Sequence, residues 1–167
     1  AAAYNALAGH DVPPLENLLS GEEGTFRWRG HRVAYTRRGS GSPLLLVHSI
    51  HAAASSYEWL NVVDALAEGH TVYTLDLVGF GLSDRPRARY TARFFIGLIG
   101  DFAAQVVGAP CTLVASSLAA AYAIVLGARD PGRFPALVLV EPTGLVRLHD
   151  APSAGGDSAR LAFETPV

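Results

Sequence analysis

The stretch Thr112-Leu113-Val114-Ala115-Ser116-Ser117-Leu118-Ala119-Ala120-Ala121 decides the fold of this chain. An apolar run that ends in two serines and continues in small residues predicts a buried strand that turns sharply into a helix. The residues two before and two after the corner of such a turn must be small, a condition that Ser117 meets through Ala115 and Ala119. Ser116 has bulky residues at both of these offsets. The pattern therefore predicts Ser117 as a candidate nucleophile, with a helix N-cap as the structural alternative.

Composition excludes several classes of function. The chain has 167 residues, half of them apolar and 17% charged, with a formal charge of −2. These values predict a single ordinary domain and argue against binding to nucleic acid or to an anionic membrane. Cys111 is the only cysteine, so we expect neither a disulfide framework nor a cysteine metal cluster, and a reducing, cytoplasmic location is the default. No apolar run approaches the ~18 residues of a transmembrane helix.

Strands and helices alternate along most of the chain. Residues 25–36 alternate apolar and polar side chains around Gly30-His31 and predict a β-hairpin. Apolar runs predict buried strands over 44–47, 71–77, 111–115 and 136–140, separated by helical patterns that begin near residues 55, 94 and 118. Right-handed crossovers then give an α/β fold with a mostly parallel, doubly wound sheet and an N-terminal antiparallel hairpin. A dinucleotide site at Gly79-Phe80-Gly81 is rejected because the third glycine is missing, and we expect no cofactor.

Several short motifs occur in a characteristic order between about Thr25 and Gly144, and through them the chain resembles the α/β-hydrolase fold enzymes. One fold hosts many reactions, so the resemblance is specific for the fold and less so for the chemistry. The motifs are Leu45-Leu46-Val47-His48, Ser56-Tyr57-x-Trp59, Asp76-x-x-Gly79-Phe80-Gly81-x-Ser83-x-x-Pro86, the turn at Ser117, Asp130-Pro131-x-Arg133-Phe134, and Leu137-Val138-Leu139-Val140-x-Pro142-x-Gly144.

The resemblance implies roles at the turn and in the loop after residues 44–47. Ser117 would be the nucleophile, and the backbone N–H of Leu118 would be one oxyanion donor. In the loop after residues 44–47 the family usually has His-Gly, where this chain has His48-Ser49. By position the second donor would be the Ile50 N–H, with Ser49 as a possible helper. Each donor of this kind contributes about 3–4 kcal/mol to the transition state.

A serine nucleophile also needs a base and an acid that orients it. Glu141 stands at the C-terminal end of the strand that follows the helix after Ser117, where some family members place the acid. The alternative is an ordinary loop carboxylate. The usual acid position and the histidine base would follow in further strands. His149 comes too soon after Glu141 to be that base. His48 and His51 are expected to hold their loop, with His51 a candidate for substrate contact, and the two alone are too few for a metal site.

The C-terminal part of the sheet is expected to be incomplete. Residues 137–140 are apolar on both faces, yet they would form an outer strand, which is normally protected. Two further strand and helix units and a cap would add roughly 60 to 100 residues. We therefore expect an N-terminal extension at 1–24, a hydrolase core at 25–144, and a segment at 145–167 that leads toward a cap or linker. The partner of the core would be the missing C-terminal part, in the same protein or in another chain.

Two functions remain open. The first is a serine hydrolase of an ester or similar acyl substrate, and the apolar residues Ile50, Tyr57, Leu82 and Leu118 favour a small hydrophobic one. Dehalogenase and epoxide hydrolase activities are disfavoured, because those relatives use a carboxylate where this chain has Ser117. The second is a non-catalytic ligand-binding or structural member of the fold, which alanine in place of the usual elbow glycines would favour.

Overall fold

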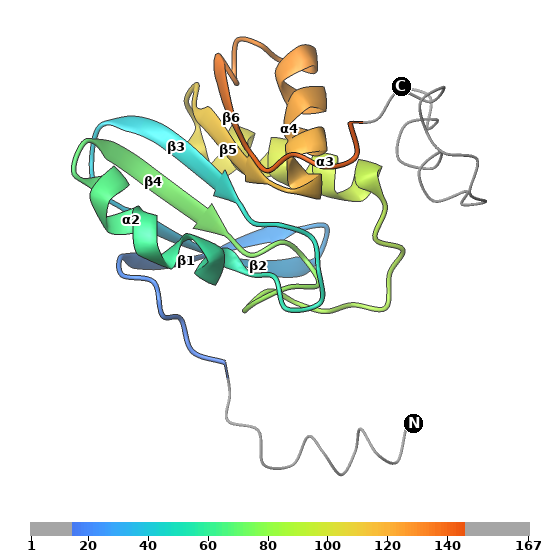
Figure 1. Ribbon diagram of the computed structural model, residues 1–167. Coiled ribbons are helices and arrows are strands. Elements are labelled where there is room, and N and C mark those ends of the chain that lie inside the picture. The colour runs from blue at the N-terminus through green and yellow to red at the C-terminus, as the bar shows by residue number, and fades with distance from the viewer. Residues whose placement is uncertain (1–14, 146–167) are drawn as a thin grey trace.

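A six-stranded sheet organises the chain in the computed structural model, which describes residues 15–145. The strand order is β1-β2-β4-β3-β5-β6 (Figure 1). Strands β4, β3, β5 and β6 are parallel, whereas β1 and β2 form an antiparallel hairpin that joins β4. The predicted α/β architecture is thus confirmed. The elements are β1 (Glu22–Trp28), β2 (His31–Arg38), β3 (Ser42–Val47), η1 (Ser56–Trp59), α2 (Leu60–Ala67), β4 (His70–Leu75), α3 (Ala92–Phe102), η2 (Ala103–Val107), β5 (Thr112–Ser116), α4 (Leu118–Arg129) and β6 (Ala136–Val140).

The N-terminal hairpin differs from the expected one in its turn and its start. Arg29 and Gly30 form the two-residue turn, with φ of 49° and 85°, instead of the predicted Gly30-His31. Two successive positive φ values match the right-handed twist of a hairpin, which explains this register. Strand β1 also begins at Glu22, inside the predicted N-terminal extension, where Glu22 forms an ion pair with Arg37 of β2.

Two of the predicted helices are also subdivided. The first begins as the single 3-10 turn η1 before α2, because the Ser55 side chain caps the turn by accepting a hydrogen bond from the Tyr57 N–H. The second runs from Ala92 to Phe102 and widens into the π-helical turn η2, which ends at Gly108 with a left-handed φ of 69°. None of the helices in residues 15–145 is long and apolar enough to cross a lipid bilayer.

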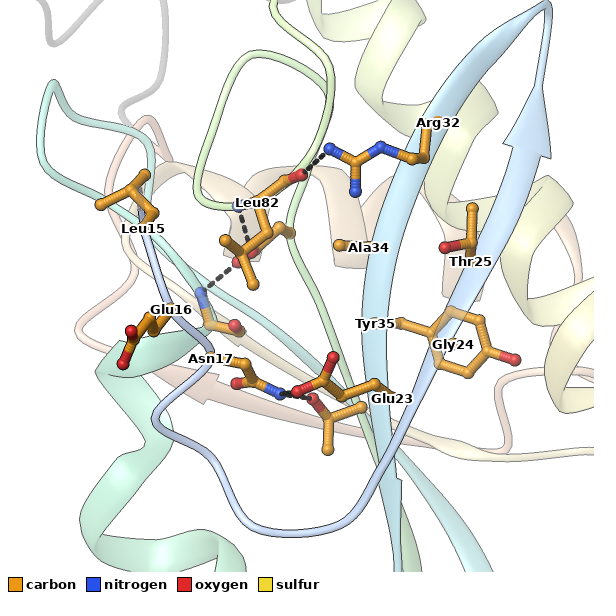
Figure 2. Close-up of a pocket in the computed structure, with 13 residues that line it drawn as sticks. Leu15, Glu16, Asn17, Glu23, Gly24, Thr25, Arg32, Ala34, Tyr35 and Leu82 are labelled. Carbon is orange, nitrogen blue, oxygen red and sulfur yellow. Dashed lines mark hydrogen bonds between the residues drawn. The ribbon is translucent and has the colours of Figure 1, made fainter. Parts of the chain in front are cut away.

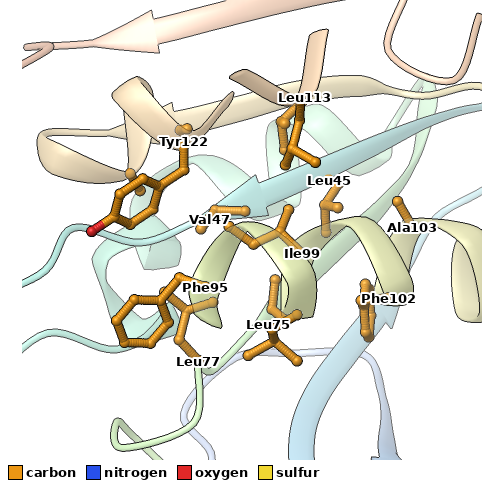
Figure 3. Packing of buried hydrophobic residues seen from close by; sticks show 14 of the residues in the cluster. Leu45, Val47, Leu75, Leu77, Phe95, Ile99, Phe102, Ala103, Leu113 and Tyr122 are labelled. Atoms are coloured by element: carbon orange, nitrogen blue, oxygen red, sulfur yellow. The ribbon is translucent and has the colours of Figure 1, made fainter. Parts of the chain in front are cut away.

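Strand β3, at the centre of the sheet, is buried on both faces, as its continuous apolar run predicted. Leu45 and Val47 of β3 pack into the larger core with α3 and α4, which Figure 3 shows around Phe95, Ile99 and Phe102. Leu44 and Leu46 of the same strand point to the opposite core, with Trp59 and Val63 of the η1–α2 segment. Alternate residues of one strand therefore fill two different cores, which is why β3 carries no polar face.

Strand β6 forms the free edge of the sheet as described over residues 15–145. It pairs with β5 through the register Thr112↔Ala136 to Ser116↔Val140. Its alternate residues Val138 and Val140 remain 48% and 37% exposed. An apolar edge of this kind is normally covered, and the expectation that further strands pair with β6 stays a prediction.

Cys111 provides a test of core packing at the start of β5. Its thiol is 1% exposed, and burial raises its pKa to about 11. We expect it to resist alkylation by iodoacetamide at pH 8 in the native protein and to react fully after denaturation in guanidinium, because only the thiolate is nucleophilic. Because the folded-state pKa lies above the ordinary thiol value of 9.0, burial of the neutral thiol stabilises the fold below about pH 9, and this contribution is lost as pH rises through 11. Native-state alkylation at the rate of the denatured protein would contradict this.

Candidate active site

Ser117 occupies the corner between β5 and α4. Its backbone has φ 53° and ψ −123°, a conformation that costs a non-glycine residue about 1–3 kcal/mol. Hydrogen bonds on both sides of Ser117 hold its backbone in this conformation. The Ser117 N–H donates to the Val140 carbonyl at 2.9 Å, and the Ala120 N–H donates to the Ser117 carbonyl at 3.1 Å. The predicted sharp turn is therefore present, and it leaves the Ser117 side chain partly exposed.

The two small residues around Ser117 are packed as the sequence required. Ala115 and Ala119 are 1% and 0% exposed, and both belong to the larger core. Ser116 is 6% exposed, so it points inward, whereas Ser117 points outward. Leu118 is the first residue of α4, where backbone N–H groups have no partner within the helix. The Leu118 N–H is thus in a position where it can receive an anionic oxygen.

Among residues 15–145, Thr143 contacts the Ser117 hydroxyl. The Ser117 Oγ lies 3.3 Å from the Thr143 Oγ1, and the Thr143 N–H donates to the Ser117 carbonyl, also at 3.3 Å. Sequence analysis did not identify Thr143. Its position just after β6 was a usable signal, because the parallel neighbours β5 and β6 end at the same edge of the sheet. The predicted acid Glu141 is exposed and has a positive φ of 45°. An acid that orients the histidine base would not contact the serine itself, so the role of Glu141 stays a prediction.

His48 holds the loop after β3 with both ring nitrogens. Its Nε2 accepts from the Leu77 N–H at 3.1 Å, so the proton is on Nδ1, which donates to the Ser49 carbonyl at 2.6 Å. The side chain is 0% exposed, and burial lowers the pKa of His48, so the ring is neutral at pH 7. His48 is thus a structural residue of the loop. His51 is exposed, and its Nδ1 accepts from the Ala53 N–H at 3.3 Å.

Glu58 is a second residue that sequence analysis missed. Its Oε2 accepts from the Ser49 N–H at 2.8 Å and from the Ser49 hydroxyl at 2.7 Å. Burial favours a raised pKa for Glu58, but hydrogen bonds from the Ser116 and Ser49 side chains and from the Ser49 N–H outweigh it, so the pKa lies below its usual value. Both Ser49 donors are engaged by this carboxylate. Of the two predicted loop donors, the Ile50 N–H is therefore the one that stays a candidate for the oxyanion site.

Asp76, at the carboxyl end of β4, accepts hydrogen bonds from two different loops. The residue is 3% exposed; its Oδ1 accepts from the Ser56 N–H and its Oδ2 from the Leu82 N–H, each at 2.7 Å. Figure 2 labels Leu82, whose N–H donates the second of these hydrogen bonds. The first loop starts η1 and the second follows Gly81, so a single buried carboxylate fixes both segments.

Replacement of Gly81 is expected to disturb this arrangement. Gly81 has a φ of 47°, and a Cβ there would collide with the Asp76 carboxylate. We expect Gly81→Ala to lower the free energy of unfolding by about 2–4 kcal/mol, because Asp76 must give up hydrogen bonds in addition to the backbone strain. Gly30→Ala is the matched control, with a φ of 85° and nothing within 4 Å of its Cβ, and it should cost about 1 kcal/mol. Equal urea midpoints for the two variants would contradict the contact argument.

A pocket of about 710 Å³ lies apart from Ser117. It is lined by residues of β1, β2 and the segment 15–17, including Glu23, Arg32 and Tyr35 (Figure 2). Ser117 is not among its lining residues. The candidate site thus depends on the backbone geometry at Ser117 and not on this pocket. Within residues 15–145, no three His, Cys, Asp or Glu side chains gather in a way that could hold a metal ion. The sequence candidate His149 lies outside the described residues.

Comparison with known proteins places the geometry in a wider context. A sequence model of the family described as alpha/beta hydrolase fold matches residues 42–163, which is most of the chain. An uncharacterized protein of Mycobacterium tuberculosis is 32% identical over 118 residues, covering 71% of this chain and 34% of the relative. A 2-hydroxy-6-oxo-6-(2'-aminophenyl)hexa-2,4-dienoic acid hydrolase of Metapseudomonas resinovorans is 31% identical over 119 residues, 70% of this chain and 41% of the relative.

Solved structures of alpha/beta hydrolase fold proteins are also similar to this chain. An alpha/beta hydrolase fold protein from Burkholderia ambifaria has a TM-score of 0.68 at 28% identity, over 80% of this chain and 47% of the other. A serine hydrolase involved in carbazole degradation has a TM-score of 0.70 at 29% identity, over 76% of this chain and 50% of the other. The chain spans about a third of the length of the first curated relatives that it matches.

Proposed function

This chain belongs to the alpha/beta hydrolase fold family, and on that basis we propose that it is a serine hydrolase acting on an ester or similar acyl substrate through Ser117. The observation that carries the proposal is the conformation of Ser117, held at φ 53° and ψ −123° between β5 and α4 with its side chain partly exposed. Strain of this size is found where surrounding structure enforces it, commonly at functional sites. Hydrolases among the similar proteins support the reaction class.

The proposed reaction has two steps. The Ser117 Oγ attacks the acyl carbon, the alcohol leaves with a proton, and the acyl group remains on Ser117. Water then attacks the same carbon, the carboxylic acid leaves, and the Ser117 hydroxyl is restored. In both steps the N–H groups of Leu118 and Ile50 would stabilise the negative oxygen. The base that accepts the Ser117 proton would be a histidine from outside the residues that the structure describes.

Two further residues enter the proposal. Thr143 lies 3.3 Å from the Ser117 Oγ and would hold the hydroxyl in one orientation before the substrate arrives. Glu141 remains the predicted acid, and His51 remains a candidate for substrate contact; both are exposed near the carboxyl ends of their strands. The partly buried side chains of Ile50, Phe80 and Leu118 pack on the core and favour a small hydrophobic acyl or alcohol group.

A fluorophosphonate probe tests this proposal. It phosphonylates activated serines, so the full-length protein should be labelled on Ser117, as located by mass spectrometry of the peptide that contains Ser116 and Ser117. The alternative is a non-catalytic ligand-binding member of the family, which is favoured by Thr143 being the partner that residues 15–145 provide for the Ser117 hydroxyl. An intact, folded preparation that takes up no label would support the alternative.

A further inference from the structure

Glu58 stands on a backbone segment that is fixed from several directions. The 3-10 turn η1 is capped by the Ser55 side chain, and the Glu58 N–H donates to the Ser55 carbonyl at 3.1 Å. Trp59, the next residue, is 7% exposed in the smaller core. The Ser56 N–H is bound to the buried Asp76 at 2.7 Å. A side chain that extends from this turn therefore starts from a defined position.

The Glu58 carboxylate joins two segments that are far apart in the sequence. Its Oε2 binds both donors of Ser49, at 2.8 and 2.7 Å, in the loop after β3. The Ser116 side chain at the end of β5 also interacts with this carboxylate and contributes to the lowered pKa of Glu58. Ser49 and Ser116 are each 6% exposed, and the hydrogen bonds from Ser49 to the exposed residue Glu58 are partly buried and charge-assisted.

Each of these two serines directly precedes part of the proposed oxyanion site. Ser49 is followed by Ile50, and Ser116 is followed by Ser117 and then Leu118. The two N–H groups come from different strands, and no covalent link sets their separation. We propose that Glu58 is a positioning residue that fixes the Ile50 N–H relative to the Leu118 N–H by holding both donors of Ser49 in the loop after β3. The inference rests on the proposed function of Ser117.

The main test compares two replacements of the Glu58 carboxylate, one that keeps its shape and one that removes it. Glu58→Gln keeps one acceptor oxygen but removes the charge, whereas Glu58→Ala removes all acceptors. With a nitrophenyl ester and the full-length protein, we expect kcat per labelled site to fall about 10-fold to 100-fold in Glu58→Ala and less in Glu58→Gln, with KM within about threefold, because a displaced donor mainly affects the transition state. Glu68→Gln removes a charge from the exposed C-cap of α2 and should match the wild type.

Active-site titration separates positioning from simple loss of folded protein. Rates are divided by the number of sites that a fluorophosphonate labels, so unfolded molecules do not count. A loss confined to the number of labelled sites, with kcat per site unchanged, would overturn the proposal. Ser49→Ala provides an independent variant: its effect and that of Glu58→Ala should be non-additive in the double variant, because the two substitutions break the same link.

The outcomes also distinguish this inference from the proposed function. If the wild type takes up no fluorophosphonate and hydrolyses no ester, the function of Ser117 itself is refuted and the inference falls with it. If the wild type is active and both Glu58 variants have its kcat per site, only the positioning role is refuted. Additive effects of Ser49→Ala and Glu58→Ala would likewise count against it.

Discussion

Ser117→Ala is expected to abolish fluorophosphonate labelling and to reduce ester hydrolysis to near the background rate. Removal of a serine nucleophile costs on the order of 10⁶ in kcat when the remaining groups are intact. Alanine keeps the Cβ, so the strained backbone at φ 53° and the surrounding hydrogen bonds of the main chain are unaffected. The thermal midpoint should therefore stay close to that of the wild type. Labelling by gel fluorescence and hydrolysis of a nitrophenyl ester measure the two effects.

The control for this variant is Ser40→Ala. Ser40 is exposed in the turn before β3, at the end of the sheet opposite to Ser117, and its replacement should change neither labelling nor hydrolysis. If Ser117→Ala still took up the label, or hydrolysed the ester at more than about a tenth of the wild-type rate, another residue would be the nucleophile. The location of the label in the wild type would then identify it.

Phe102→Ala is expected to have the largest effect on stability. Phe102 is 0% exposed at the end of α3, and its ring makes edge contacts with Phe26, Tyr35 and Tyr73 at centroid distances of 5.7, 5.2 and 6.4 Å. Figure 3 shows it between α3 and the strands. Truncation of a fully buried phenylalanine costs about 3–5 kcal/mol, because contacts are lost and the cavity does not close. Urea denaturation followed by tryptophan fluorescence measures the change.

A matched control separates burial from apolar character. Val62 of α2 is apolar but 42% exposed, so Val62→Ala should change the free energy of unfolding by less than about 0.5 kcal/mol. Both variants remove apolar side-chain atoms from a helix. Similar losses for the two would mean that Phe102 does not occupy the tightly packed position described above.

Most of the fold was predictable from local sequence patterns. The continuous apolar run at 44–47 predicted a strand buried on both faces, and its residues do alternate between two cores. The small residues around Ser117 predicted the sharp turn, because a tight corner excludes large side chains through contacts only two residues away. The hairpin turn was misplaced by one residue, since sequence alone did not show that Arg29 would accept a positive φ of 49°.

The candidate site was predictable only in part. Ser117 and Leu118 follow from the turn itself, and the loop at Ser49 and Ile50 follows from the end of a neighbouring parallel strand. Thr143 was not found, because its 3.3 Å contact with Ser117 crosses 26 residues and depends on the register of β5 and β6. Glu141 was chosen as a carboxylate at a strand end; its predicted partner is the histidine base and not the Ser117 hydroxyl, so its role stays a prediction.

The sequence by itself determined the order of strands and helices, the burial of the parallel strands and the corner at Ser117, because these depend on residue size and periodicity over a few neighbouring positions. The tertiary structure alone decided how polar groups pair: His48 with Leu77, Glu58 with Ser49, and Asp76 with Ser56 and Leu82. A hydrogen bond requires two atoms within about 3 Å at a suitable angle. That condition is set only when the sheet brings distant segments to one edge, and no periodic pattern along the chain encodes it.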